Sequence, residues 1–298
     1  MSSSSASILA RLKSKAKKKR IPFQQLLNLF CQEEFIRRLA QSNYSDRLIL
    51  KGGFLLYLIS GFTTRPTVDA DYLLKNHSNE ISLVERMVTL ILDEKTAHDF
   101  TTIAIRNIEV ISEIKEYHGI RVNLAGHISN TVTPFSVDIG VGDTIIPSAI
   151  KRTLPAILED FTQPTILTYS LESTVSEKFD AIIRFMEFTG RMKDFYDIYY
   201  LAVSFEFEGR KLQEAIHETL SQRGTPYKSD SVVVIQRLIN NDEIINRWVN
   251  FCNKILKYEL SLKNVVELII KLIDPPFQAM INEGEFFKRW NPYEKHYE

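Results

Sequence analysis

Two aspartates separated by one residue, Asp69 and Asp71, have the types and spacing that best suit a chemical role. They lie in residues 67–74, whose β-branched residues and alternation predict a strand. Side chains two apart in a strand point to the same face, so the two carboxylates repel each other. In a pocket a divalent cation relieves that repulsion, and Mg²⁺ prefers carboxylate oxygens. The two aspartates predict a metal site, although an Asp-x-Asp motif without further support more often lies at a solvated strand edge.

Two glycines precede this pair by about sixteen residues. Gly52 and Gly53 close a short predicted strand at 48–53, and a helix is expected to begin directly after them. Without side chains, glycines let backbone N–H groups approach a phosphate, and a helix N-terminus adds attraction for the anion. Arg65 and Thr67, just before the aspartates, could contact phosphate or simply fix the entry to the strand.

A third acid, Asp138, lies in another predicted strand at 134–141, between apolar Val137 and Ile139. A charged residue there is costly without a partner. Two-metal phosphoryl transfer needs about three carboxylates to hold metals roughly 4 Å apart. The order of these motifs therefore predicts phosphoryl-transfer chemistry more specifically than any single motif does: first the glycine pair, then the two aspartates, then the distant strand aspartate.

The elements that must position these residues fall into two parts. Strands are predicted at 48–53, 67–74, 103–116, 119–128 and 134–141, with a helix at 81–94 packed on the sheet. After Leu171 the pattern changes to helices at 172–188, 193–203, 209–221, 229–239, 243–257 and 262–273. We predict an α/β (α+β) fold, with a mixed-sheet catalytic domain and its N-terminal helices at 1–160 and an all-helical domain at 161–298.

Composition excludes several other classes. The two cysteines, Cys31 and Cys252, are far apart, which argues against a disulfide framework or a zinc site and favours buried thiols. No apolar run approaches the ~20 residues that cross a bilayer, so we expect a cytoplasmic protein with no membrane partner. Formal net charge is zero, yet residues 11–20 carry seven Lys and Arg and no acid. This basic stretch suits contact with nucleic acid, or is simply a solvated helix.

The order of motifs resembles the nucleotidyltransferase superfamily, with its Gly-Gly, DxD and distant Asp. More narrowly, the chain resembles the AbiEii/AbiGii toxins, the nucleotidyltransferases of type IV toxin–antitoxin and abortive-infection systems. The resemblance covers almost the whole chain and is carried by the segments KGG, RPTVDADYLL, VDIGVGDTIIP, LESTVSEKFDAIIRF and GRMKDFYDIYYL. One departure is DADY, where the family reads closer to DIDL; both carboxylates are retained.

The resemblance implies a nucleotidyltransferase-fold domain, a helical domain that completes the cleft, and a role for each matching residue. Asp69, Asp71, Lys178 and Asp197 would be catalytic, and Asp69, Asp71 and Asp138 would bind Mg²⁺. Gly52, Gly53, Arg65, Thr67 and Lys178 would bind the nucleotide. Asp143, in a family-like GD pair, is an alternative third carboxylate. With the resemblance, Arg191 and Asp194 would support Lys178 and Asp197. Without it, Arg191, Lys193, Asp194 and Asp197 favour a salt-bridged turn between two packed helices.

These roles describe an Mg²⁺-dependent enzyme that transfers a nucleotide from an NTP to an acceptor hydroxyl. By resemblance the acceptor is the 3′ end of tRNA, which would block translation and serve phage defence, with the 11–20 stretch holding the RNA backbone. A cognate antitoxin, encoded nearby and forming no stable complex, is also implied. Two alternatives stay open: a protein or small-molecule acceptor, and a non-catalytic module that binds nucleotide or RNA.

Overall fold

The computed structural model of the protein describes residues 5–67, 69–75, 78, 80–96, 100–111 and 119–298. The chain divides into two compact units. The first, here the sheet unit, comprises Met1–Gly142 and Ile150–Thr168. The second, the helical unit, comprises Asp143–Ala149 and Tyr169–Glu298. The short segment Asp143–Ala149 thus belongs to the helical unit, although the residues that precede it and those that follow it, up to Thr168, belong to the sheet unit.

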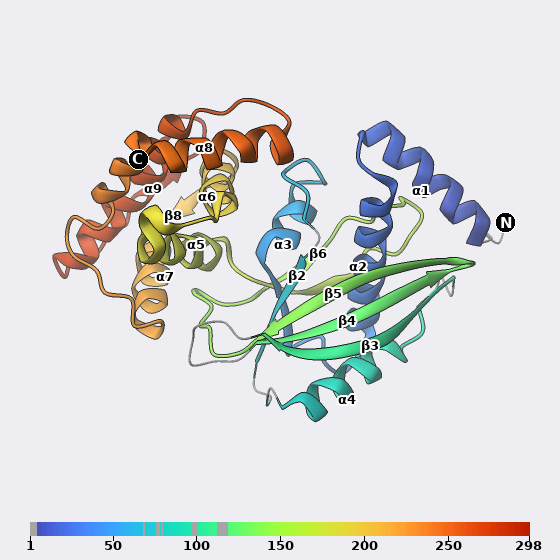
Figure 1. Ribbon diagram of the computed structural model, residues 1–298. Helices are drawn as coiled ribbons and strands as arrows, with labels where there is room; N and C mark the ends of the chain where they lie inside the picture. Colours follow the sequence, from blue (N-terminus) through green and yellow to red (C-terminus); the bar gives the residue numbers. More distant parts are fainter. Residues whose placement is uncertain (1–4, 68, 76–77, 79, 97–99, 112–118) are drawn as a thin grey trace. The chain divides into compact units, whose positions relative to one another are not determined.

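A mixed seven-stranded sheet forms the centre of the sheet unit, in the order β3-β4-β5-β2-β1-β7-β6 (Figure 1). Its strands are β1 (Leu48–Lys51), β2 (Asp69–Leu74), β3 (Thr101–Ile111), β4 (Gly119–Ile128), β5 (Thr131–Gly140), β6 (Ile150–Thr153) and β7 (Thr165–Thr168). β2 runs parallel to β5 and β1 parallel to β7, while the other neighbours are antiparallel. The α/β fold class predicted from the sequence is confirmed.

Four helices accompany this sheet: α1 (Ser5–Lys19), α2 (Phe23–Gln41), α3 (Gly52–Ile59) and α4 (Ile81–Leu92). α2 packs on the face of the sheet to which Ala70 and Tyr72 point, and its Phe35 ring meets Tyr72 edge-on at 5.7 Å. α4 packs beside α2 and against β3. Because alternate strand residues point to opposite faces, Asp69 and Asp71 lie on the face opposite α2.

Charged residues of α2 are buried, which the amphipathic pattern of its sequence does not indicate. Glu33, Glu34, Arg37 and Arg38 are each at most 6% exposed. Arg37 pairs with both glutamates, with Nε 2.8 Å from Glu34, and Arg38 donates to the Thr101 carbonyl of β3 at 2.7 Å. Paired in this way, the charges avoid most of the penalty for burial and fix α2 against the edge of the sheet.

The helical unit contains α5 (Leu171–Phe185), α6 (Met192–Ser204), α7 (Gly209–Gln222), α8 (Asp242–Phe251) and α9 (Leu262–Ile281). Three short helical segments lie between these helices: the 3₁₀ turn Met186–Phe188, the 3₁₀ helix Val233–Asn240 and the π-helical turn Cys252–Leu256. The sequence predicts only helices in this region. The structure adds a small antiparallel sheet of β8 (Phe207–Glu208), β9 (Arg289–Asn291) and β10 (His296–Tyr297).

Helix α9 continues to Ile281 through Pro275 and Pro276, whereas the sequence predicts an end at 273. A proline lacks the N–H that would bond the carbonyl four residues earlier, so Pro276 leaves the Leu272 carbonyl without its helical donor. The hydroxyl of Tyr297, in β10, donates to that carbonyl at 2.6 Å. A residue far along the chain therefore replaces the missing bond, which no local pattern could indicate.

Smaller differences concern the ends of elements. The structure includes β6, at the edge of the sheet, and its neighbour β7, which the sequence analysis does not predict. Residues 112–116 of the predicted strand 103–116 lie outside the described residues. Cys31 and Cys252 are buried free thiols, as predicted. Within the described ranges, every helix is too short or too polar to cross a membrane.

Candidate active site

Nine polar residues form two parallel rows across the open face of the sheet. Residues paired in register point to the same side, and strand positions two apart share a face. The first, the amide row, consists of Asp69, Ser136, Asn123 and Asn107 on successive strands. The second, the charged row, consists of Lys51, Asp71, Asp138, Arg121 and Glu109. The predicted site residues Asp69, Asp71 and Asp138 therefore share one face, and Asp71 and Asp138 are direct register partners.

Gly52 lies against the carboxylate of Asp71. It follows β1 directly and begins α3, with a positive φ of 72°. A Cβ at this position would stand 2.2 Å from Asp71 Oδ2, closer than any side chain allows. Glycine is thus required here both by the left-handed backbone and by the contact. The N-terminus of α3, where the first N–H groups have no intrahelical acceptor, begins beside Asp71, one of the three predicted metal ligands.

Gly53 contacts the other two residues that the sequence predicts for phosphate binding. A Cβ on Gly53 would lie 3.0 Å from Arg65 Nη2 and 3.4 Å from Thr67 Oγ1. Arg65 is only 7% exposed. The Thr67 hydroxyl lies 3.3 Å from the backbone N–H of Asp69, which donates to it. Arg65 and Thr67 therefore both border the start of α3, and Thr67 also fixes the entry to β2, so both predicted roles remain open to them.

Asp138 is held by an arginine that the sequence analysis does not single out. Arg121 Nε and Nη2 donate to its two carboxylate oxygens at 2.8 and 2.6 Å, a bidentate pair. The hydrogen bond with Asp138 raises the pKa of Arg121, and the Asp69 charge adds to this against a lowering by burial. The guanidinium is therefore permanently charged and interacts electrostatically with Asp69 as well as with Asp138.

This arrangement fits one kind of Mg²⁺ site better than another. Across the described ranges, three or more His, Cys, Asp or Glu side chains nowhere approach closely enough to hold a metal together. Mg²⁺, however, is usually bound by one or two protein carboxylates together with water and substrate phosphates. Asp69 and Asp71, side by side near the start of α3, fit that arrangement. Asp138 could join them only by exchanging its partner Arg121.

Lys178 and Asp197, the two predicted site residues of the helical unit, form an ion pair. Lys178 Nζ lies 2.7 Å from Asp197 Oδ2 and 3.0 Å from Asp194 Oδ1. Arg191 Nε pairs with the other oxygen of Asp194 at 2.6 Å. Burial would raise the pKa of Asp194, but the charges and hydrogen bonds of Lys178 and Arg191 outweigh it and lower the pKa. The two cations and two carboxylates form the salt-bridged turn that the sequence suggests without the family resemblance, and the catalytic roles predicted for Lys178 and Asp197 stay predictions.

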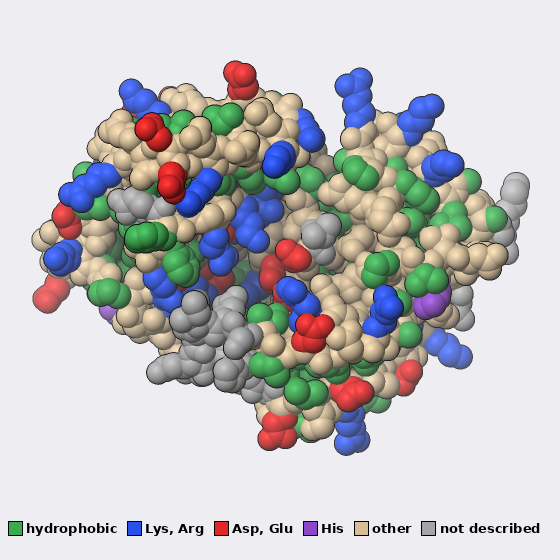
Figure 2. All heavy atoms as spheres, in the orientation of Figure 1, with side chains coloured by type: hydrophobic (Ala, Val, Ile, Leu, Met, Phe, Trp, Pro, Cys, Tyr) green, Lys and Arg blue, Asp and Glu red, His purple; other side chains and the backbone are tan. Residues whose placement is uncertain are grey.

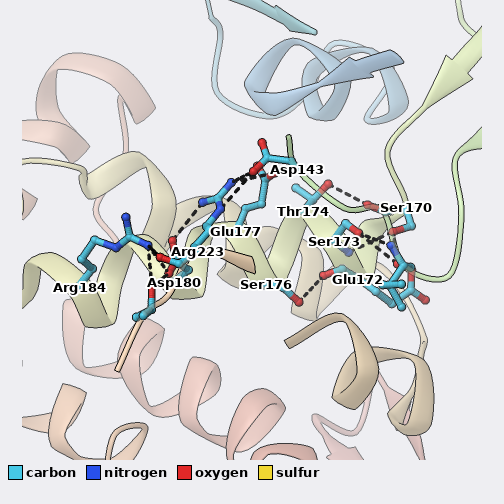
Figure 3. Close-up of polar contacts among 12 residues, drawn as sticks. Asp143, Ser170, Glu172, Ser173, Thr174, Ser176, Glu177, Asp180, Arg184 and Arg223 are labelled. Carbon is cyan, nitrogen blue, oxygen red and sulfur yellow. Dashed lines mark hydrogen bonds and ion pairs between the residues drawn. The ribbon is translucent and has the colours of Figure 1, made fainter. Parts of the chain in front are cut away.

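Asp143, the alternative third carboxylate, belongs to a different group within the helical unit (Figure 3). Arg223 on the C-terminal side of α7 pairs with Asp143 at 2.9 Å and with Glu177 and Asp180 of α5 at 3.0 Å each. The segment is also held at Ile146, whose N–H donates to Ser173 Oγ at 2.8 Å. Asp143 thus anchors its segment to the helices, whereas Asp138 is the acid in register with Asp71.

Two solved structures share the fold of this chain. A crystal structure of JHP933 from Helicobacter pylori is similar, with a TM-score of 0.51 at 14% identity over 87% of this chain and 96% of that chain. A further H. pylori crystal structure, which carries a provisional nucleotidyltransferase assignment, gives a TM-score of 0.51 at 14% identity, over 87% of this chain and 99% of that one. Among proteins with curated descriptions, none matches.

The family follows from the sequence itself. The model of the nucleotidyl transferase AbiEii toxins, of type IV toxin–antitoxin systems, matches residues 34–283. The chain belongs to this family, which confirms the resemblance noted above. Membership supports nucleotidyl transfer as the general activity and places the protein in a toxin–antitoxin context.

Proposed function

We propose that the protein is a metal-dependent nucleotidyltransferase toxin. It transfers a nucleotide from an NTP to an acceptor hydroxyl at the 3′ end of tRNA, and so stops translation. The observation that supports this most directly is the contact of Gly52 with the Asp71 carboxylate at the start of α3. It brings a phosphate-binding backbone next to one of two neighbouring carboxylates, so an anion and a cation are both favoured there.

In this proposal Asp69 and Asp71 hold Mg²⁺, which when bound supplies a Lewis acid for the reacting phosphate. The backbone N–H groups of Gly52 and Gly53 orient the triphosphate, and Arg65 neutralises part of its charge. Thr67 keeps Asp69 in place through the hydrogen bond to its backbone. Asp138, paired with Arg121, completes the polar surface beside Asp71.

Lys178 and Asp197 keep the roles that the family resemblance gives them: Lys178 contacts the triphosphate and Asp197 supports activity. The described ion pair offers a physical reason for the second role. Asp197, 1% exposed and 2.7 Å from Lys178 Nζ, fixes the position of the ammonium. Its loss would leave Lys178 with a different set of partners and a less defined orientation.

An RNA acceptor is supported by the charge distribution of α1. Its apolar side, Ile8, Leu12 and Ala16, is buried, so the lysines between these positions turn outward. Figure 2 shows Lys and Arg side chains gathered around this end of the sheet unit. Such a surface attracts a phosphate backbone without reading its sequence.

The test is transfer of label from each of the four NTPs to total tRNA, with Mg²⁺ or with EDTA. We expect one NTP to label tRNA only when Mg²⁺ is present. Asp69→Asn and Asp71→Asn should each lower the rate by about 100-fold or more, a loss of the size seen when a group that stabilises transition-state charge is removed. The matched control is Asp46→Asn, an exposed aspartate of the same unit.

Wild-type protein that labels no tRNA, while a tRNA nucleotidyltransferase does so in the same buffer, would refute the proposed acceptor. Labelled product that forms in cell lysate and resists RNase would indicate that the acceptor is a protein or a small molecule. Growth arrest that is equally strong with Asp69→Asn would instead indicate a binding protein without turnover. In the proposed setting the toxin acts in the cytoplasm, and its antitoxin is encoded nearby and forms no stable complex with it.

A further inference from the structure

A polar groove of about 570 Å³ opens on the sheet unit next to Asp69. Its floor is the amide row, and its walls come from β3, β4, β5 and α2. β2 begins opposite Ser136, so β5 extends beyond it, and Asn28 of α2 lies there, donating from Nδ2 to the Pro134 carbonyl at 3.0 Å. Over these strands Figure 2 shows acidic and basic side chains on the surface. The groove therefore leads directly away from a proposed catalytic carboxylate.

Hydrogen bonds within the groove leave it rich in acceptors. Glu109 Oε1 accepts from Asn107 Nδ2 and from Asn123 Nδ2, at 2.7 Å each. A carboxylate can only accept, so both amides must turn their NH₂ groups toward Glu109. Their Oδ1 atoms, together with the Ser136 hydroxyl, then remain for a ligand. The same Glu109 holds both side chains in place, so the pair is preorganised before any ligand binds.

The side chain of Asn28 borders the groove and carries one unsatisfied acceptor. Its Oδ1 atom is buried and has no hydrogen-bond partner among the described residues. A buried acceptor without a donor is costly, and native structures contain few of them. Because Oδ1 is screened from solvent, a ligand donor in the groove reaches it only after the Asn28 side chain turns.

Charge decides what kind of ligand fits. Asp69 and Glu109 are acidic, and Arg106 is the one basic residue of the lining, so a triphosphate would be repelled here. Arg106 falls at a register shift of β3, between Ile105 and Asn107, which takes it out of the ladder. Such bulges change the direction of a side chain next to functional sites. The groove thus suits an uncharged group with several donors, followed by a single phosphate.

We propose that this groove binds the terminal ribonucleoside of the RNA acceptor. The ribose hydroxyls donate to the Oδ1 atoms of Asn107 and Asn123, and Arg106 pairs with the adjoining phosphodiester. The row ends at Asp69, and Asn123 is two strands from it, roughly 10 Å at the usual strand spacing, so a nucleoside held on the amides lies within about its own length of the carboxylate where transfer is proposed to occur. The inference rests on the proposed function for the identity of the acceptor, but it concerns binding, which needs neither NTP nor metal.

The test is fluorescence polarisation of a short 5′-labelled single-stranded RNA, with EDTA present and no NTP. One probe ends in a 2′,3′-diol and the other in a 2′,3′-dideoxynucleotide. Wild-type protein should bind the diol probe about tenfold more tightly, the value expected when one or two neutral hydrogen bonds are lost. The double variant Asn107→Ala/Asn123→Ala should bind both probes alike, and Ser136→Ala should show a smaller loss of preference. Asn43→Ala, an exposed asparagine outside the groove, should behave as wild type.

The inference would be overturned if wild type bound the two probes equally. It would also be overturned if the double variant kept the preference for the diol probe while melting at the same temperature as wild type. Displacement of the diol probe by kanamycin, at a concentration that leaves the dideoxy probe bound, would assign the groove to a small amino sugar and also overturn it. Label transfer with no diol preference refutes the groove alone. Diol preference without any label transfer refutes the proposed activity and leaves the groove standing.

Discussion

Replacing Gly52 with alanine should lower the transfer rate far more than its effect on the stability of the fold can explain. The φ of 72° costs alanine roughly 1–2 kcal/mol, which for a unit of this size lowers Tm by about 2–8 °C. The new Cβ would also stand 2.2 Å from Asp71 Oδ2, 3.0 Å from its Cγ and 3.1 Å from its Cβ. Turning the carboxylate about its own bond cannot relieve all three contacts. Asp71 must therefore retreat by about 1 Å, a displacement that can cost about 100-fold in rate.

Gly61 provides the matched control, because its φ of 64° imposes the same backbone strain and no heavy atom lies within 4 Å of its Cβ position. Gly61→Ala should lose a similar few degrees in Tm and keep its activity. Both variants are compared by thermal unfolding and by transfer of label from the preferred NTP to tRNA. If Gly52→Ala and Gly61→Ala retain equal transfer rates, the contact with Asp71 has no part in the reaction and the reasoning fails.

Three further predictions concern charge. Arg121→Gln should tighten Mn²⁺ binding by up to about fivefold in a calorimetric titration, because a cation that competes for Asp138 is removed; weaker binding would contradict this. Asp194→Asn should lower the unfolding free energy at pH 7 by about 3 kcal/mol, since it breaks a buried pair with Lys178. The pKa of Asp194 is lowered, so its stabilisation is present above the ordinary value of 3.8 and is lost as pH falls through the lowered pKa. Urea unfolding should therefore show the two proteins converging at low pH, and a constant gap would refute the sign. Changing three exposed lysines to alanine should reduce the slope of log K against log salt for RNA by about 2, measured against wild type, and an unchanged slope would exclude α1 from the contact. These lysines are Lys13, Lys17 and Lys18.

Much of the site could be predicted because its residues are marked locally. Gly52 and Gly53 stand between a strand and a helix, and Asp69 and Asp71 lie two apart in a strand, so each motif can be read from a few adjacent residues. The structure brings these motifs together, with Arg65 and Thr67 beside them. Their metal and nucleotide roles stay predictions.

The residues that sequence reasoning missed depend on register. Arg121 and Asn123 alternate with buried Ile120, Val122 and Leu124, a pattern that does indicate one polar strand face. Which residue of β5 faces each of them is set by the pairing of β4 with β5, and a shift of one residue would turn every side chain to the other face. The pairing of Arg121 with Asp138 could therefore not be read from the sequence, nor could the replacement of a helical donor by Tyr297.

The passage of the chain between the two units has a practical consequence for fragments. β7 is the parallel neighbour of β1, yet it follows Asp143–Ala149, which belongs to the other unit. A fragment that ends at residue 142, or at the predicted domain boundary at residue 160, would lack β7. The hydrogen-bonding edge of β1 would then be exposed and would favour aggregation. An expression boundary for the sheet unit must therefore include residue 168, and residues 143–149 would need to be replaced by a short engineered linker.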